Sequence, residues 1–474
     1  FLYVKGANTM DFKDNAMFQQ MEKDTNVKIN WQYAGDADWS EQKSLLLASG
    51  DLPDVFFGDN ALKDNDIATN LDMFIPLEDY FEKYCPNISA ILDLPGVREK
   101  MTAPDGHIYT IPYVCGDTTV GYSPYINTKW LENVGMSMPT TTDEFEAVLK
   151  AFKEQDANGN GDASDEIPFS TDPNNKHIEA MAGYFGLPMN KLGIAIQDEK
   201  VVYGGVSNTY REFLSWFHKL YADGLVDVEL YTQDSSTWEG KGNQDLYGVS
   251  IAYGSNEFTG IPAAEERGDF DSMPVLNTDK GGIWLRDTEG FSVYRTQAVI
   301  TNKAEHPEII CRWFDNAFAL ENGIGCNRGP VGVIVNKEDD GYHAIDTTTL
   351  SEEDQEKYSW SNLWPQSLPK YLPADFEFVE EHPMYDEKKA TEEAYEANLT
   401  KEIIPSYWID LDKIDTFSDT NTAIKDFFEQ QQAQFVCGEL DIDNDADWQA
   451  YVDGMYSLGL EDWVATQGIE EIAK

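Results

Sequence analysis

The sequence predicts an α/β fold with more than one domain, in which a parallel sheet is covered by helices. The chain has 474 residues, which exceeds the usual size of one domain. Its composition, 41% hydrophobic and 13% aromatic, is that of a globular protein. Strand-like and helix-like segments alternate from the first residue, and no low-complexity linker interrupts them. Two domains joined by several chain crossings therefore explain the pattern better than one flexible tether.

The first segments read as strand, helix, strand, helix and strand. Residues 1–6 form the first strand, and residues 15–26 follow as a helix with Met17, Phe18 and Met21 on one face. Residues 27–33 alternate in the period of a half-buried strand, and residues 39–50 form a short helix that Gly50 ends. The apolar run 52–59 is the third strand. Ligands of parallel sheets bind beyond the carboxyl ends of the strands, so loops 8–11, 34–40 and 58–60 are expected at the binding rim.

Later segments continue this alternation. Two strand-like runs lie on either side of Gly116, and residues 141–155 form a helix. Thr141 and Glu144 have the spacing of a capping box at its start. Residues 296–318 repeat the strand-then-helix pattern, with Pro307 suited to a first helical position. The tail from about residue 416 is helical again.

The charge limits the classes of partner. Lys and Arg total 34 against 86 Asp and Glu, which gives 34 − 86 = −52. Such a field repels nucleic acids and anionic membranes and tolerates a neutral ligand. The sequence lacks an apolar run of about 18 residues, and a mature protein whose leader was removed would begin as this chain does, at Phe1. The five cysteines lack a Cys-x-x-Cys pair, so we expect reduced thiols, with no disulfide framework and no zinc site.

Residues 156–167, DANGNGDASDEI, have the spacing of a calcium loop. Oxygen donors stand at positions 1, 3, 5 and 7, Gly161 at position 6 allows the turn, and two carboxylates follow early. The predicted ligands are Asp156, Asn158, Asn160, the Asp162 carbonyl, Asp165 and Glu166. Position 12 is Ile167, not Glu, and no exit helix follows, so we expect a structural Ca²⁺ site and not a sensor. The alternative is a solvated turn without metal.

Four stretches resemble one family, the extracellular solute-binding proteins of ABC sugar importers, which includes oligosaccharide-binding lipoproteins. They are MFQQMEKDTNVKINWQY, LLLASGDLPDVFFGD, the block from YINTKWL to DEIP that contains the calcium loop, and ITNKAEHPEIICRWFD. In calcium-binding members the loop is one residue shorter before its Asp-Glu pair. Asp156, Asn158, Asn160 and Asp162 are therefore carried over more safely than Asp165 and Glu166. The stretch NGIGCNRGPVGVIV departs from the commoner members, so the resemblance does not give the sugar.

The resemblance implies a periplasmic-binding-protein-like fold, in which two α/β lobes close on a ligand in the cleft between them. Lobe 1 is expected at residues 1–122 plus about 296–350, and lobe 2 at about 123–295 plus 351–474. The calcium ion would lie in lobe 2, away from the cleft. The resemblance also implies an upstream N-terminal lipid anchor, an extracellular or periplasmic location, and a permease and an ATPase as partners. We expect a monomer.

An oligosaccharide is held by aromatic rings on its apolar faces and by polar groups at its hydroxyl edges. Tryptophans at helical spacing are expected in the core, whereas exposed loop indoles are costly unless they bind something. The predicted ligand residues are Trp39, Asp59, Asn60, Tyr122, Trp238, Tyr253, Trp284, Arg286, Arg328, Trp360 and Trp364. The predicted function is non-catalytic oligosaccharide capture for an importer. The alternatives are a binding protein for peptides or another small solute, and a glycoside hydrolase.

Overall fold

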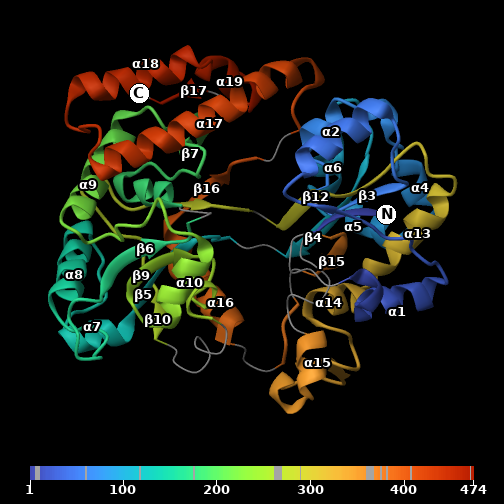
Figure 1. Ribbon diagram of the computed structural model, residues 1–474, viewed down its shortest axis with the longest axis horizontal. Helices are drawn as coiled ribbons and strands as arrows, with labels where there is room; N and C mark the ends of the chain where they lie inside the picture. Colours follow the sequence, from blue (N-terminus) through green and yellow to red (C-terminus); the bar gives the residue numbers. More distant parts are fainter. Residues whose placement is uncertain are drawn as a thin grey trace. The chain divides into compact units, whose positions relative to one another are not determined.

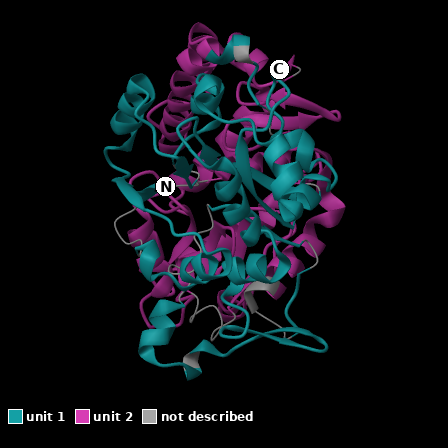
Figure 2. Cartoon of the chain, turned by 90° about the vertical axis from the view of Figure 1, so that its right-hand side faces the viewer, with its two compact units in different colours: residues 1–117, 290–380, 406–414 teal, residues 118–289, 381–405, 415–474 magenta. Residues whose placement is uncertain are grey.

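The computed structural model describes residues 1–5, 11–58, 61–116, 119–173, 177–260, 269–288, 290–358, 368–373, 376–379, 383–405, 408–469 and 471–473. The chain divides into two compact units, coloured separately in Figure 2. Unit 1 is Phe1–Asp117, Gly290–Glu380 and Ser406–Ile414, and unit 2 is Thr118–Glu289, Glu381–Pro405 and Asp415–Lys474. Each unit is therefore built from three separate stretches of sequence.

Besides short shifts at residues 118–122 and 290–295, the units differ from the expected lobes in two stretches. Residues 351–380 and 406–414, placed in lobe 2 by sequence, are grouped with unit 1. The reason for the first is β15 (Lys370–Leu372), which pairs in parallel with β4 (Thr110–Gly116). The reason for the second is Trp408, which packs against an apolar cluster of unit 1.

Unit 1 contains a six-stranded sheet with the order β15-β4-β12-β3-β1-β2. Its other strands are β1 (Leu2–Lys5), β2 (Gln32–Gly35), β3 (Val55–Phe57) and β12 (Phe291–Ile300). β12 is antiparallel to both neighbours, and the remaining pairs are parallel, so β1, β2 and β3 end at one edge as predicted, and β4 ends there too. β2 is shorter than the predicted strand 27–33, because its ladder with β1 begins only at Gln32.

Helices cover both faces of this sheet. Tyr3 and Phe57 face one apolar cluster with α1, α4, α5 and α13, whereas Leu2, Val4 and Phe56 face another with α2 and α3. This alternation is the two-residue period of a strand buried on both faces. The helices and 3₁₀ turns are η1 (Phe12–Asp14), α1 (Ala16–Thr25), α2 (Trp39–Ser49), α3 (Asp64–Ala68), η2 (Leu71–Met73), α4 (Glu78–Tyr84), α5 (Pro86–Leu92), α6 (Val97–Met101), α13 (Pro307–Ala317), α14 (Leu320–Arg328), η4 (Thr347–Thr349), α15 (Glu352–Lys357) and η7 (Leu411–Lys413).

Unit 2 contains three smaller sheets, with the orders β10-β5-β9-β6, β17-β8-β7 and β11-β16. The strands are β5 (Ser123–Asn127), β6 (Ile167–Thr171), β7 (Ile194–Gln197), β8 (Lys200–Tyr203), β9 (Tyr247–Ala252), β10 (Phe270–Ser272), β11 (Trp284–Arg286), β16 (Leu399–Ile403) and β17 (Glu471–Ile472). The helices and 3₁₀ turns are α7 (Thr128–Val134), α8 (Thr142–Glu154), η3 (Ile178–Phe185), α9 (Asn208–Ala222), α10 (Ser235–Asn243), α11 (Asn256–Thr259), α16 (Pro383–Tyr395), η6 (Glu396–Asn398), α17 (Ile414–Cys437), α18 (Asp445–Ser457) and α19 (Leu460–Thr466). The C-terminal helices α17, α18 and α19 lie together beside β7 and β17 (Figure 1).

Helix α8 forms as predicted and leads into the loop with calcium-type spacing. The Thr141 side chain accepts a hydrogen bond from the Glu144 amide at 3.2 Å, which caps the first turn. Its apolar stripe is fully buried: Phe145, Val148, Leu149 and Phe152 have at most 1% of their surface exposed. β6 follows the loop, so the predicted absence of an exit helix is confirmed.

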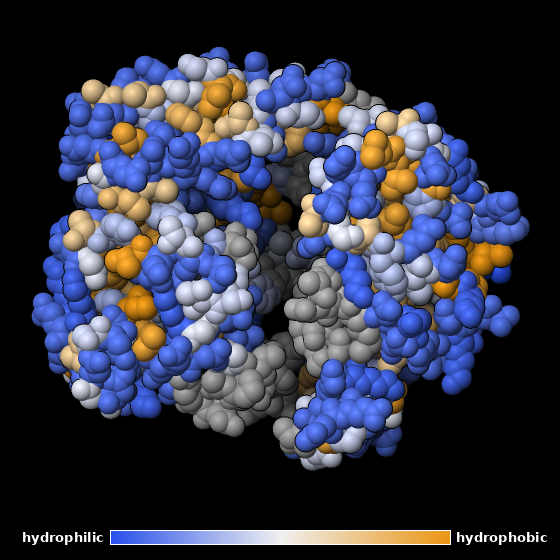
Figure 3. Space-filling view, in the orientation of Figure 1, coloured by the Kyte–Doolittle hydropathy of each residue, from blue (hydrophilic) through white to orange (hydrophobic). Residues whose placement is uncertain are grey.

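Hydrophilic residues dominate the face shown in Figure 3, and apolar residues occur on it as small separate patches. Within the described residues, the helices are all too short or too polar to cross a membrane. Charged and polar side chains thus cover most of the visible face, in line with the net charge of −52.

Candidate ligand-binding site

Three aromatic rings of unit 2 lie together, and two of them were predicted ligand residues. β5 and β9 are antiparallel, with Ser123 opposite Ala252, so Tyr122 and Tyr253 extend the same end of this pair. Their ring centroids are 6.2 Å apart in an edge-to-face arrangement. His177 stacks on Tyr122 with centroids 4.1 Å apart and planes 14° apart. We call Tyr122, His177 and Tyr253 the unit 2 aromatic group.

This group combines an accessible ring with a neutral imidazole. Tyr253 has 41% of its surface exposed, which is high for a large aromatic side chain. Burial, and secondarily the charge of Lys191, lowers the pKa of His177 to about 4. His177 is therefore uncharged near neutral pH, and its stack on Tyr122 is an apolar contact. An exposed ring beside a firmly packed pair offers a flat surface of the kind that a sugar ring can cover.

A half-buried lysine lies against the Tyr253 ring. Lys388 of α16 has its Nζ 4.0 Å from the ring centroid and donates hydrogen bonds to the carbonyl oxygens of Gly121 and Tyr253. Burial lowers the pKa of Lys388 to about 8, against the opposing effect of nearby carboxylates such as Glu392. This cation ties the backbone before Tyr122 to the backbone at Tyr253.

Carboxylates fix the backbone on both sides of the group. The Thr119 amide donates to Glu392 at 2.9 Å, the Gly121 amide donates to Asp287, and the Tyr253 amide donates to Glu257 at 2.9 Å. Burial raises the pKa of both Glu257 and Glu392, although these amide hydrogen bonds oppose the rise. The rings are therefore held by charged groups that are already engaged. The arrangement is suited to binding a ligand in a fixed place.

Unit 1 carries a second pair of tyrosines. Tyr113 of β4 stands opposite Tyr294 of β12, with centroids 5.4 Å apart and planes 17° apart. Tyr294 has 53% of its surface exposed, and Lys370 of the neighbouring β15 places Nζ 4.5 Å from the Tyr113 centroid. Burial lowers the pKa of Lys370 to about 7. Unit 1 thus also combines an exposed tyrosine with a lysine, but here the lysine lies against Tyr113, the less exposed ring of the pair.

The predicted residue Arg328 lies near this unit 1 pair. It ends α14, and the preceding residue, Asn327, accepts a hydrogen bond from the Tyr113 hydroxyl at 3.1 Å. Burial raises the pKa of Tyr113, and the positive charge of Arg328 acts in the opposite direction. The structure therefore brings Arg328 to Tyr113, a residue that the sequence analysis did not select.

The three predicted tryptophans within the described residues are packed in the interior. Trp39 begins α2, Trp238 lies in α10 and Trp284 begins β11, so they do not lie in loops as expected. Their exposed fractions are 6%, 3% and 2%. Trp39 donates to the Ala61 carbonyl at 2.9 Å, and Trp238 donates to the Ser250 hydroxyl at 3.2 Å. In this conformation these rings present no free face to a ligand.

The remaining predicted ligand residues have separate surroundings. Arg286 lies in β11, where its side chain donates to the Thr400 carbonyl at 3.2 Å and forms an ion pair with Glu396 at 3.1 Å. It therefore joins β11 to β16. Asp59, Asn60, Trp360 and Trp364 lie outside the described residues.

The loop 156–166 forms a compact, self-bonded turn. Asp156 accepts from the Gly161 amide at 2.9 Å, and the Asn158 and Asn160 side chains donate to Asp165 at 3.1 and 2.7 Å. Gly159 and Gly161 have φ values of 76° and 95°, which other residues rarely adopt. The loop thus turns sharply, as its spacing predicts.

Two buried carboxylate oxygens of this loop lack hydrogen-bond partners. They are Asp156 Oδ1 and Glu166 Oε2, and burial raises the pKa of Glu166. Glu166 Oε1 accepts from the Ala157 amide at 2.8 Å, which aims the carboxylate back at the loop. Unsatisfied buried oxygens next to amide and carboxylate oxygens form a donor set that suits a hard cation. The residues therefore fit a calcium ion.

The family can now be identified. The family described as "Bacterial extracellular solute-binding protein" matches residues 6–323. The chain belongs to this family. The resemblance seen in the sequence is thereby confirmed, and the two units are consistent with the two-lobe α/β fold of these proteins.

Two curated relatives align with a large part of the chain. The fructooligosaccharide ABC transporter substrate-binding protein FusA of Streptococcus pneumoniae serotype 4 is 34% identical over 335 residues, which is 68% of this chain and 61% of FusA. Lipoprotein LipO of Bacillus subtilis (strain 168) is 27% identical over 270 residues, which is 54% of this chain and 50% of LipO. The matched part of the chain thus spans about half to three fifths of these relatives.

Solved structures show the same fold over almost the whole chain. S. pneumoniae FusA in complex with kestose superposes with a TM-score of 0.84 at 26% identity, covering 98% of this chain and 97% of FusA. An ABC-transporter-associated solute-binding protein from Bifidobacterium longum infantis has a TM-score of 0.80 at 24% identity over 98% and 96% of the two chains. A further FusA structure is described as an EF-hand mutant in complex with fructo-nystose.

Four of the residues that the sequence analysis missed in the two aromatic groups are Tyr113, Tyr294, His177 and Lys388. Tyr113 and Tyr294 lie inside strands, where tyrosine commonly packs, and only their cross-strand register shows that they form a pair. His177 and Lys388 are far from Tyr122 and Tyr253 in the sequence, and Lys388 lies in an acidic helix that reads as a solvated face. Only the tertiary fold brings these four to their partners.

Proposed function

We propose that this protein captures an oligosaccharide outside the cell and delivers it to the permease of an ABC importer. The observation that carries this proposal is the similarity to FusA, whose structure in complex with kestose matches 98% of this chain at a TM-score of 0.84. The exposed Tyr253 and Tyr294 support it, because stacking on an aromatic ring is a common way to hold a sugar. The importer's permease and ATPase are proposed as partners, and the protein as a monomer.

We propose that the unit 2 aromatic group contacts the sugar. Tyr253 would stack on an apolar sugar face, and Tyr122, backed by His177, would present its ring edge and hydroxyl. Lys388 and the carboxylates would hold these rings in place without reacting, because their polar atoms are already bonded to backbone. The proposed role is therefore binding, with the sugar leaving intact. Steady release of smaller sugars during incubation would show a glycoside hydrolase instead.

The experiment that tests the function is a thermal-shift screen in calcium buffer. The panel contains kestose and nystose, other plant and host oligosaccharides, and aromatic peptides. Fructooligosaccharides come first because FusA, at 34% identity, is named for them. A ligand that binds only the folded state raises the melting temperature, and the rise increases with concentration. A shift with one glycan class supports the proposal, whereas a shift with peptides and with no glycan would replace it by peptide binding.

We further propose that loop 156–166 binds a structural calcium ion. Asp156, Asn158, Asn160, the Asp162 carbonyl, Asp165 and Glu166 would supply the oxygens. The support comes from the two unpartnered buried oxygens, Asp156 Oδ1 and Glu166 Oε2. The ion would neutralise the carboxylates and fix the connection between α8 and β6. Its contribution would be to stability.

We propose that the protein is held at the extracellular face of the cell membrane by a lipid anchor on an upstream cysteine, as in a Gram-positive cell. A periplasmic location is the alternative. Membership of an extracellular solute-binding family supports a site of action outside the cytoplasm. Globomycin treatment and cell fractionation of the source organism test the anchor. Release of the protein into the medium without any lipid-modified form would contradict it.

A further inference from the structure

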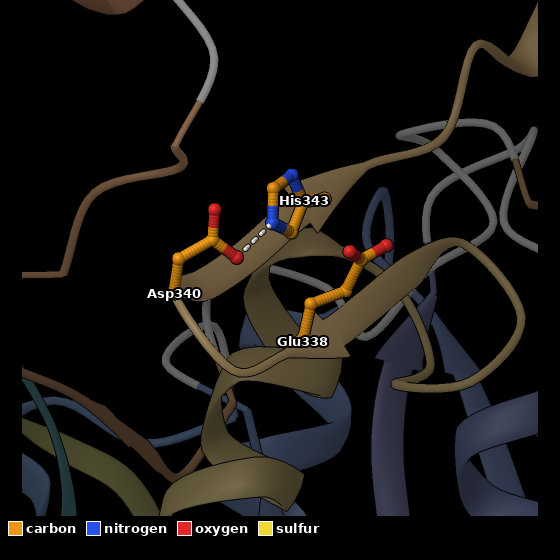
Figure 4. Close-up of side chains that lie close together, drawn as sticks. All are labelled: Glu338, Asp340 and His343. Carbon is orange, nitrogen blue, oxygen red and sulfur yellow. Dashed lines mark hydrogen bonds and ion pairs between the residues drawn. The ribbon is translucent and has the colours of Figure 1, made fainter.

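A hairpin of unit 1 carries two carboxylates and an imidazole close together. β13 (Val335–Glu338) and β14 (Gly341–Ala344) are antiparallel, and residues 339–340 form the turn between them. The cluster consists of Glu338, Asp340 and His343 (Figure 4). Each of these side chains offers one metal-ligating atom, and the three atoms lie within 4.8 Å of one another. They form a cluster distinct from the aromatic sites and from loop 156–166.

The hairpin register explains why these side chains meet. His343 is opposite Asn336 and Gly341 is opposite Glu338, so Glu338 and His343 lie diagonally on one face of the hairpin. Gly341 has no side chain, and the Val379 side chain packs where a Cβ at Gly341 would lie. Asp340 reaches back from the turn, and its Oδ1 lies 2.9 Å from His343 Nε2.

The other face anchors the hairpin. Tyr342 is in contact with Phe376 at a centroid distance of 5.6 Å, and the Val379 amide donates to the Tyr342 carbonyl at 2.9 Å. Lys337, next to Glu338, is held by Glu321 at 2.7 Å. The nearest lysine in the sequence is therefore engaged away from the cluster, and the strands that carry the ligands are fixed.

We propose that Glu338, Asp340 and His343 bind a divalent transition-metal ion of the zinc class. Two carboxylates balance a divalent charge, and an imidazole nitrogen favours zinc-class ions over calcium, which prefers oxygen ligands. Bond lengths of about 2.1 Å place the ligand atoms of a tetrahedral ion roughly 3.4 Å apart. The Asp340–His343 distance is already shorter than this, and the exposed Glu338 side chain closes the remainder by rotating. The fourth position is left for water.

The geometry also sets the strength of the proposed site. The Asp340 side chain is 65% exposed and the His343 side chain is 17% exposed, so the ion would lie at the surface. The protein's net charge of −52 attracts cations and raises their concentration near the surface. The proposed ion is therefore exchangeable.

The test is a calorimetric titration of the whole chain with zinc chloride in a buffer that contains excess Ca²⁺. All proteins carry Cys437→Ser, because Cys437 is an exposed thiol that would bind zinc by itself. The variant is His343→Ala, and the matched control is His306→Ala. His306 is an exposed histidine of the same unit that lies 3.5 Å from one carboxylate, Glu308, and does not belong to the cluster of Glu338, Asp340 and His343.

We expect one zinc ion per chain and binding at least about tenfold weaker in His343→Ala, since loss of an outer-shell partner alone costs about 10–100-fold. His306→Ala should bind as the parent does. Absence of zinc binding by the parent, or equal affinities of the His343→Ala and His306→Ala proteins, would overturn the proposal. If His343→Ala fails to fold, Glu338→Gln provides the same comparison, because Glu338 is exposed and its amide isostere keeps the shape.

Discussion

Tyr253 of the unit 2 aromatic group and Trp284 both lie at the end of a strand, but they differ in how much of their surface is exposed. Tyr253 follows β9 and is 41% exposed, whereas Trp284 begins β11 and is 2% exposed. Trp284 is enclosed by the rings of Tyr184 and Tyr395, at 5.8 and 5.5 Å. Tyr253 instead lies against the Lys388 amine and, edge to face, against Tyr122, and keeps 41% of its surface exposed. The comparison shows that the partners supplied by the tertiary fold, aromatic rings for Trp284 and a lysine for Tyr253, accompany burial in one case and exposure in the other.

The largest expected effect belongs to the buried member of this comparison. Trp284→Ala removes a ring from the core of unit 2 and should lower the free energy of unfolding by about 3–5 kcal/mol. Thermal and denaturant unfolding measure it. Tyr253→Ala is the control and should unfold close to the parent, because its ring is largely exposed. A Trp284→Ala protein that keeps the stability of the parent but loses ligand binding would contradict the assignment of Trp284 to the core.

Calcium removal should give the next largest effect. At a calcium concentration of about 100 times the dissociation constant, a bound ion stabilises the folded state by about 2.7 kcal/mol. Chelation should therefore lower the melting temperature by several degrees. Asp156→Asn should reproduce that loss in calcium buffer, while Asp279→Asn, an exposed aspartate of the same unit, should not. An unchanged melting curve after verified metal removal would count against the ion.

Loss of the exposed ring should affect binding and leave folding intact. Tyr253→Ala should weaken oligosaccharide binding at least about tenfold, or about 1.4 kcal/mol, as expected for a central aromatic contact. Tyr456 is the matched control, because it is 42% exposed on α18 of the same unit. Calorimetry with the ligand found in the screen measures both variants. Equal losses in the two would remove Tyr253 from the site.

A further expected effect is the pH dependence that Lys388 contributes. The pKa of Lys388 in the folded protein, about 8, lies below the usual lysine value of 10.5, so between these pH values the unfolded chain binds more protons. Stability from this group therefore rises as pH increases from about 8 to 10.5. Lys388→Met should lack that rise, and the difference between the two melting curves against pH measures it. A stability of the parent relative to Lys388→Met that falls between pH 8 and 10.5 would contradict the burial of the charged amine.

Local sequence patterns were sufficient to predict those elements that depend mainly on residues close to them in the sequence. The order from β1 to β3, the α8 stripe ending at Phe152 and the sharp turn at Gly161 are of this kind. Tertiary packing decided the rest. Whether Trp284 is exposed depends on Tyr395, which lies in a different stretch of unit 2. Tyr122 and Tyr253 were selected from sequence, but His177 and Lys388 were not, because no local pattern marks a long-range contact.

The most direct test of the central claim is a calorimetric titration of the intact protein with kestose in calcium buffer, followed by recovery of the sugar. Capture for import predicts saturable binding of one kestose per chain and recovery of the unchanged trisaccharide after long incubation. Heats no larger than dilution for kestose and for every other glycan of the panel, or recovery of shortened sugars, would contradict it.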